Sequence, residues 1–313
     1  MVKYKMRKVI KVVGVLIITI VLVTLLILSY YKLADIQSKV PQGIKQKYNV
    51  VARRFIGRNV FVISSKVQSD NKNEVKEDGE SNKSNNGMVI LYFHGGSYVA
   101  EATEQHWEFL CKLVDDTGAT AIMSDYPLTP KYTYKDVFEM VEPLYKEIVD
   151  RVDANNLVVM GDSAGGGLAL ALEEKIGGEE LYPLPSKTIL ISPWLDVRLT
   201  NPEIDEVQKR DKELNKETLR VAGIAYAGND GINSYLVNPI DGDLSKIKNL
   251  TILTGTNDIL NPDAHLLQQK AATQGTNIDL KEYEGAGHIW MIEKNSSQEL
   301  IDQGYNDIIK ILN

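Results

Sequence analysis

The segment 157–172, LVVMGDSAGGGLALAL, limits the possible folds of this chain more than any other feature. It contains a continuous apolar run, then Gly161-Asp-Ser-Ala-Gly165, then a run rich in Ala and Leu. A G-x-S-x-G pattern between a buried strand and a helix is typical of a sharp turn that presents the serine hydroxyl above a sheet. The segment therefore predicts a strand, a tight turn and a helix, with Ser163 as a candidate nucleophile.

Further short apolar runs alternate with helical patterns along the chain. Several are continuously apolar, as expected for strands that are buried on both faces. Alternation of strands and helices predicts an α/β fold with a mainly parallel central sheet and helices on both faces. Besides 157–161, the predicted strands are 88–93, 120–125, 188–192, 250–254 and 278–283.

Charge and cysteine content exclude several classes of protein. The 42 acidic side chains outnumber the 35 basic ones, and five of the basic ones lie in the first eleven positions. The rest of the chain is therefore a poor surface for polyanions, and we expect no nucleic-acid partner. Cys111 is the single cysteine, so neither an intrachain disulfide nor a four-cysteine metal site can form. We expect no cofactor and no metal.

The N-terminal region predicts a membrane anchor. Residues 12–31 carry no charge, and twenty residues of helix span about 30 Å, the thickness of the hydrocarbon core of a bilayer. The alternative is a cleaved signal peptide, but the run is longer than usual and no A-x-A pattern follows it. The basic residues in 1–11 favour a cytoplasmic tail, with the bulk of the chain outside the cell membrane.

The rest of the chain is predicted to form one large domain behind a stalk. Residues 32–49 are polar and mixed, which suggests the stalk, and residues 50–313 suit a single α/β domain. Residues 64–87 are rich in Asn, Ser, Lys, Glu and Asp and predict a flexible loop between two strands. Residues 198–235 lie between the predicted strands 188–192 and 250–254, and this segment is longer than one crossover connection needs. They predict a helical cap over the serine, and the alternative is a surface excursion away from it.

A serine nucleophile needs a base, and the base needs a carboxylate. His288 lies in a glycine-rich loop after the last predicted strand, and Asp258 directly follows strand 250–254. Loops at the carboxyl ends of parallel strands meet where ligands bind. The chain order Ser163, Asp258, His288 is also the order that this type of fold uses. Asp263 is the competing carboxylate. His106 and His265 fall in predicted helices and are expected to be solvated or packed there.

Residues 94–98, HGGSY, directly follow the first predicted strand of the parallel set. Glycines allow backbone N–H groups to approach a substrate oxygen that a Cβ atom would block. Together with the N–H of Ala164, these groups would form an oxyanion hole. His94 is expected to hold the loop by hydrogen bonds. The alternative for the segment is a purely structural glycine turn.

From Val89 to the C-terminus the chain resembles the hormone-sensitive-lipase-like branch of the α/β-hydrolases, which includes many bacterial esterases and acetylesterases. The resemblance implies an α/β-hydrolase fold with Ser163 as nucleophile, His288 as base and Asp258 as the group that orients it. It also implies Gly96, Ser97 and Ala164 as oxyanion-hole donors. The motifs that carry it are HGGSY (94–98), SDYPLTP (124–130), GDSAGGG (161–167), NPIDGDLSKIKNLTILTGTNDIL (238–260) and GAGH (285–288).

Three departures from the family pattern bear on the substrate more than on the chemistry. Ser97 replaces a third glycine, Gly167 stands where Asn is common, and the segment 126–131 reads YPLTPK where the family has Tyr-Arg-Leu-Ala-Pro-Glu. Only the N–H of Ser97 would be used, so its side chain is compatible with the oxyanion hole.

These features together predict a membrane-anchored serine hydrolase that acts on small carboxylic esters outside the membrane, with the bilayer as its other partner through residues 12–31. A cap that covers the serine predicts a preference for short acyl chains, from acetyl to hexanoyl. The same residues could cleave an amide or transfer an acyl group to an envelope acceptor. A non-catalytic surface binding module is a further alternative.

Overall fold

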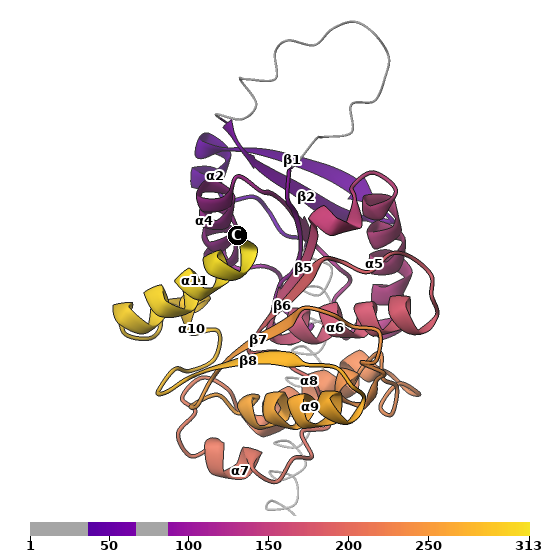
Figure 1. Ribbon diagram of the computed structural model, residues 1–313, viewed down its shortest axis with the longest axis vertical. Helices are drawn as coiled ribbons and strands as arrows, with labels where there is room; N and C mark the ends of the chain where they lie inside the picture. The colour runs from indigo at the N-terminus through magenta and orange to yellow at the C-terminus, as the bar shows by residue number, and fades with distance from the viewer. Residues whose placement is uncertain (1–36, 67–86) are drawn as a thin grey trace, which may run out of the picture. The chain divides into compact units, whose positions relative to one another are not determined.

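The computed structural model describes residues 37–66 and 87–313, which belong to one compact unit that begins at Gln37. An eight-stranded sheet runs through this unit, with helices packed on it (Figure 1). In chain order the elements are α2 (Gln42–Lys47), β1 (Tyr48–Phe55), β2 (Arg58–Ser65), β3 (Val89–Phe93), α4 (Glu104–Thr117), β4 (Thr120–Ser124), α5 (Tyr134–Val149), η1 (Ala154–Asn156), β5 (Leu157–Asp162), α6 (Ser163–Gly178), β6 (Lys187–Ile191), α7 (Ile204–Val207), α8 (Lys216–Ala227), η2 (Pro239–Asp241), β7 (Leu250–Gly255), α9 (Asn261–Thr273), β8 (Ile278–Tyr283), α10 (Trp290–Glu293) and α11 (Gln298–Leu312).

The strand order is β1-β2-β4-β3-β5-β6-β7-β8. β1 pairs with β2 and β2 pairs with β4 in antiparallel register. Every pairing from β4 through β3 to β8 is parallel. The parallel strands therefore all end at one edge, and the loops that leave this edge carry Ser163, Asp258 and His288.

Two apolar clusters cover the two faces of the sheet. One contains buried side chains of α5, α6, α8 and α9, and the other contains those of α4, α10 and α11. Figure 1 shows α4, α10 and α11 on one side of the sheet and α5, α6 and α9 on the other. The central strands β5 and β7 are buried at every residue because helices cover both faces. The predicted α/β architecture is therefore confirmed.

All six predicted strands are present, but two more precede them. β1 has a mixed pattern of half-buried and exposed residues, with Arg53 and Arg54 in its second half. β1 is an edge strand without a clear apolar pattern, and neither it nor β2 is among the strands predicted from the sequence. The domain also begins earlier than predicted. Residues 42–49 of the predicted stalk form α2 and the start of β1, and Ile44 is buried against the domain.

Several predictions concern residues outside the described ranges. The basic tail 1–11, the anchor 12–31 and the first part of the stalk lie outside them, as do residues 67–86 of the predicted loop. β2 ends at Ser65 and β3 begins at Val89, so residues 64–65 of that predicted loop belong to a strand. Within residues 37–66 and 87–313, no helix combines the length and the apolar character needed to cross a bilayer.

The interval between β6 and β7 contains α7 and α8, as the predicted helical cap requires. Asn215 caps α8, since its side chain accepts a hydrogen bond from the Thr218 N–H. Gly223 faces Val197 and Trp194, where a Cβ atom would come within 2.6 Å of Val197 Cβ. α8 therefore packs closely on the loop that follows β6.

A buried carboxyl in α6 predicts a pH-dependent stability. Glu173 is 2% exposed, and burial raises its pKa from 4.5 to about 8, although a hydrogen bond from Thr188 opposes this. The folded state then binds this proton more tightly than the unfolded state. The stabilisation is complete below about pH 4.5 and is lost as the pH rises toward about 8. We expect Glu173→Gln to raise Tm at pH 8 by about 3 °C or more, and to change it less at pH 5.

Thermal unfolding of the two proteins at both pH values measures this difference. Glu179→Gln is the matched control, because Glu179 is an exposed acid at the end of the same helix. A Tm gain that is equal at pH 5 and pH 8 would show that the proton on Glu173 is not its source.

Candidate active site

Ser163 lies in the strained turn between β5 and α6. Its φ is +50°, in the left-handed region that non-glycine residues rarely adopt. The flanking glycines make the turn possible. A Cβ atom on Gly161 would lie 2.3 Å from the Gly165 carbonyl oxygen, and one on Gly165 would lie 2.0 Å from the Phe93 carbonyl oxygen. The G-x-S-x-G pattern therefore has the structural role that the sequence predicts.

The structure brings His288 and Asp258 into direct contact. His288 Nδ1 lies 2.9 Å from Asp258 Oδ2, and the other oxygen, Oδ1, accepts from the Leu260 N–H at 2.9 Å. Asp258 is completely buried and His288 is 6% exposed. Because the carboxylate accepts at Nδ1, the ring carries its proton there and Nε2 has a free lone pair.

Hydrogen bonds of the backbone hold together the loop that carries Asp258 and the loop that carries His288. The Asn257 N–H donates to the Ala286 carbonyl at 2.9 Å, and the Gly285 N–H donates to Thr256 Oγ1 at 2.9 Å. On the other side of His288, the Ile289 N–H donates to Ser192 Oγ at 3.2 Å. The imidazole is therefore positioned by both neighbouring strands, β7 and β8, and by the loop after β6.

The electrostatic environment of His288 suits a general base. Burial alone would lower its pKa, but the negative charge of Asp258 and the hydrogen bond to it outweigh burial, so the pKa lies above the usual value. Glu213, from the cap segment, contributes in the same direction. An imidazole of raised basicity is a stronger proton acceptor once it is neutral.

Asp263, the competing carboxylate, lies elsewhere. It belongs to the first turn of α9, and no hydrogen bond within the described part of the chain joins it to His288. The contact between His288 and Asp258 is thus the arrangement that the sequence analysis preferred.

The loop 94–98 has a conformation that leaves backbone donors free. Gly96, Ser97 and Tyr98 all have positive φ, at 113°, 54° and 62°. Among the described residues, no hydrogen bond engages the N–H of Gly96 or Ser97. The N–H of Ala164 lies in the first turn of α6, where backbone donors have no partner within the helix. These three N–H groups could stabilise a developing oxyanion.

A buried network beneath this loop was not predicted from the sequence. The Asp162 carboxylate accepts from the Gly95 N–H at 3.0 Å and from the Tyr92 hydroxyl at 2.5 Å. His106 Nε2 lies 3.2 Å from the same carboxylate, and His106 Nδ1 accepts from the Thr103 N–H. His106 is therefore packed and not solvated, which is one of the two alternatives that the sequence predicts for it. Asp162, held by His106, thus joins the loop 94–98, the donor loop, to the turn that carries Ser163.

The two other histidines have the roles expected for them. His94 is buried, its Nδ1 donates to the Gly95 carbonyl at 2.6 Å, and its ring stacks on Tyr126. Burial, with a smaller effect of His106, lowers the pKa of His94 to about 4, so it stays neutral. His265 lies on α9 and pairs at the surface with Glu282 at 3.1 Å.

The cap segment, residues 198–235, contacts three of the loops of this site, those that carry Asp258, His288 and Tyr98. The Asp211 carboxylate accepts from the Ile259 N–H at 2.9 Å, next to Asp258. A Cβ atom on Gly287, next to His288, would lie 2.4 Å from Glu213 Oε1. On α8, the Tyr226 ring stacks on the Tyr98 ring of the donor loop, with 3.6 Å between their centroids. This favours a cap that packs on the loops of the site over a surface excursion.

Comparison with known proteins agrees with this geometry. The profile of a family described by its alpha/beta hydrolase fold matches residues 90–292, which include all six predicted site residues. A solved structure from Staphylococcus aureus matches with a TM-score of 0.75 and 25% identity, over 89% of this chain and 90% of that one. An esterase from the bacterial hormone-sensitive lipase family has the same fold, with a TM-score of 0.72 and 22% identity over 90% of this chain and 86% of its own.

Two curated relatives are similar in sequence. An acetyl-hydrolase of Streptomyces hygroscopicus is 28% identical over 205 residues, which are 65% of this chain and 68% of the relative. An esterase of Acinetobacter venetianus is 30% identical over 201 residues, 63% of this chain and 66% of the relative. The matches thus span about two thirds of each of these relatives.

Proposed function

This chain belongs to the hormone-sensitive-lipase-like branch of the α/β-hydrolase family, a branch of ester hydrolases, and we propose that Ser163, His288 and Asp258 are its catalytic triad. The observation that carries the proposal is the contact of 2.9 Å between His288 Nδ1 and Asp258 Oδ2. It sits at the same edge of the sheet as the strained turn of Ser163.

The proposed reaction has two steps. His288 Nε2 takes the proton from Ser163 Oγ as this oxygen attacks the ester carbonyl carbon. The N–H groups of Gly96, Ser97 and Ala164 stabilise the oxyanion, and the protonated His288 gives its proton to the departing alcohol. Water, deprotonated by His288, then attacks the acyl carbon. The bond from this carbon to Ser163 Oγ breaks, His288 returns the proton to Oγ, and the acid is released. Asp258 keeps the ring in the required tautomer.

We also propose that the substrates are esters of short acids. The cap contacts the Tyr98 loop and the loops of Asp258 and His288, and Ser163 is only 4% exposed. A site so enclosed has little space for a long acyl chain. Relatives that are called acetyl-hydrolase and esterase agree with this proposal.

A series of p-nitrophenyl esters from acetyl to palmitoyl tests both the activity and the acyl preference. We expect kcat/KM to be highest between acetyl and hexanoyl and to fall by at least about 100-fold at dodecanoyl. This corresponds to on the order of one kcal/mol for every two or three methylene groups that do not fit into the acyl site. A maximum at dodecanoyl or longer would contradict the closed cap. Absence of hydrolysis across the whole series would contradict the esterase proposal itself.

We propose further that residues 12–31 anchor the enzyme in the cell membrane, with the catalytic domain outside. The uncharged run and the basic residues in 1–11 support this topology. Protease added to intact cells should release the domain by cleavage before α2. Full protection until the cells are lysed would reverse the orientation. Release of the unproteolysed domain by a salt wash would argue against the anchor.

A further inference from the structure

A polar cavity of about 390 Å³ lies between the loop after β6, the helix η2 and the first turns of α9. Its lining contains none of the six residues proposed for catalysis. It includes Asp196, Arg198, Asn201, Asp241, Asp263 and Lys270. The volume is in the range of cavities that hold small molecules.

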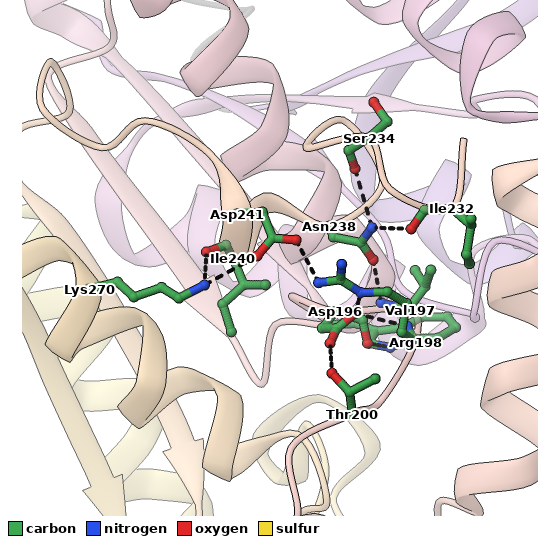
Figure 2. A network of polar contacts seen from close by, with 11 residues as sticks. Asp196, Val197, Arg198, Thr200, Ile232, Ser234, Asn238, Ile240, Asp241 and Lys270 are labelled. Carbon is green, nitrogen blue, oxygen red and sulfur yellow. Dashed lines mark hydrogen bonds and ion pairs between the residues drawn. The ribbon is translucent and has the colours of Figure 1, made fainter. Parts of the chain in front are cut away.

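Most charged groups of the lining are paired with one another (Figure 2). Arg198 donates to Asp196 and to Asp241, with N–O distances of 2.6 Å in both pairs. Lys270 lies 3.2 Å from Asp241 and 3.0 Å from the Ile240 carbonyl oxygen. The remaining oxygen of Asp196 accepts from Thr200. Both cations and two of the carboxylates are therefore satisfied within the wall.

Asp263 is the exception. It is 1% exposed and lines the cavity, and neither carboxylate oxygen makes a hydrogen bond of normal geometry among the described residues. The Asn201 side chain is the nearby donor that lowers its pKa. A buried carboxyl that lacks donors is destabilising, because it has lost its hydrogen bonds to water. A carboxylate offers about four acceptor positions and the Asn201 amide can serve at most two of them, so the wall leaves Asp263 with acceptor capacity for a donor from within the cavity.

The charge of the lining indicates which donor it accepts. Four carboxylates, those of Asp196, Glu203, Asp241 and Asp263, face two permanent cations, and His265 is paired with Glu282 outside the wall. An extra positive charge is therefore favoured over a neutral hydroxyl. A metal ion is a poor candidate, because no group of three or more His, Cys, Asp or Glu side chains in the described ranges could hold one.

We propose that this cavity binds a small organic ammonium, whose N–H groups donate to the Asp263 carboxylate. The ligand would supply both the missing hydrogen bonds and the missing charge. The site is separate from the ester-cleaving residues, so ligand binding does not require turnover and can be measured without it.

The proton on Asp263 gives the binding a distinctive signature. Burial raises the pKa of Asp263 to about 7, and Asp196 adds to this, whereas Asn201, Arg198 and Lys270 oppose it. Near pH 7 a substantial fraction of the site is protonated. A bound ammonium favours the carboxylate, so binding should release a proton and should weaken as the pH falls from 8 to 6.

Calorimetric titration of the full chain in detergent with ethanolamine hydrochloride tests the proposal. We expect saturable binding with an affinity at least about fivefold lower at pH 6 than at pH 8. At pH 7, binding should release less than one proton per site, which is measured by repeating the titration in two buffers of different ionisation enthalpy. Ethylene glycol, which replaces the ammonium by a hydroxyl, is the matched neutral probe. It should bind at least about tenfold more weakly.

Two variants locate the site. Asp263→Asn should remove the proton release and lower the ethanolamine affinity by at least about tenfold. Glu203→Gln, at an exposed acid of the lining, should lower it by less than about threefold. Absent binding, equal affinity for ethylene glycol, or unchanged affinity in Asp263→Asn would each overturn the proposal. If Asp263→Asn does not fold, the proton release and pH dependence of the unaltered chain decide it.

Discussion

Ser163→Ala should reduce ester turnover by a factor on the order of 10⁶, to the level that the oxyanion donors alone provide. The reason is the conformation of the turn between β5 and α6. Ser163 has φ +50° between the closely packed Gly161 and Gly165, and it is the one hydroxyl residue of the segment 161–165. No other hydroxyl can take its place in an acyl-enzyme. Initial rates with p-nitrophenyl acetate measure the loss.

A fluorophosphonate probe gives the same test without turnover, because it labels an activated serine covalently. Labelling should be present in the unaltered chain, lost in Ser163→Ala and retained in Ser245→Ala, which changes an exposed serine. Circular dichroism would verify that the Ser163→Ala variant is folded. Undiminished turnover or labelling in a folded Ser163→Ala protein would mean that another residue is the nucleophile.

The parallel part of the fold could be read from the sequence because its signals are local. β5 and β7 are buried at every residue, so each gives an uninterrupted apolar run. Gly161 and Gly165 are required around Ser163, because a Cβ atom at either position would come within 2.3 Å and 2.0 Å, respectively, of a backbone carbonyl oxygen. The G-x-S-x-G pattern therefore indicates the turn by itself. These features do not depend on distant parts of the chain.

The features that were missed depend on contacts between distant residues. β1 has no apolar stripe of its own, and its strand conformation comes from its pairing with β2. His106 and Asp162 are 56 positions apart, and nothing near either residue marks their contact. The cavity of Asp263 likewise combines three separate segments, 196–203, 240–241 and 262–270.

Replacement of the two competing aspartates should separate their roles. Asp258→Asn should lower kcat by a factor on the order of 10⁴. The Asn amide would donate to Nδ1 of His288, so the ring proton would move to Nε2, and Nε2 could no longer accept the proton of Ser163. Asp263→Asn should lower kcat by less than about tenfold, since no hydrogen bond in the described part of the chain joins Asp263 to His288. Both changes keep the size of the side chain and replace a carboxyl group by an amide.

The pH dependence of kcat/KM provides a second readout that a general loss of stability would not produce. His288 acts as a base only when it is neutral, and Asp258 is the main cause of its raised pKa. Loss of the carboxylate should therefore move the acid limb of the profile to lower pH in Asp258→Asn, while Asp263→Asn leaves this limb in place. A large rate loss and a shifted limb in Asp263→Asn, with neither in Asp258→Asn, would assign the triad carboxylate to Asp263. In that case the contact between His288 and Asp258 would have only a structural role.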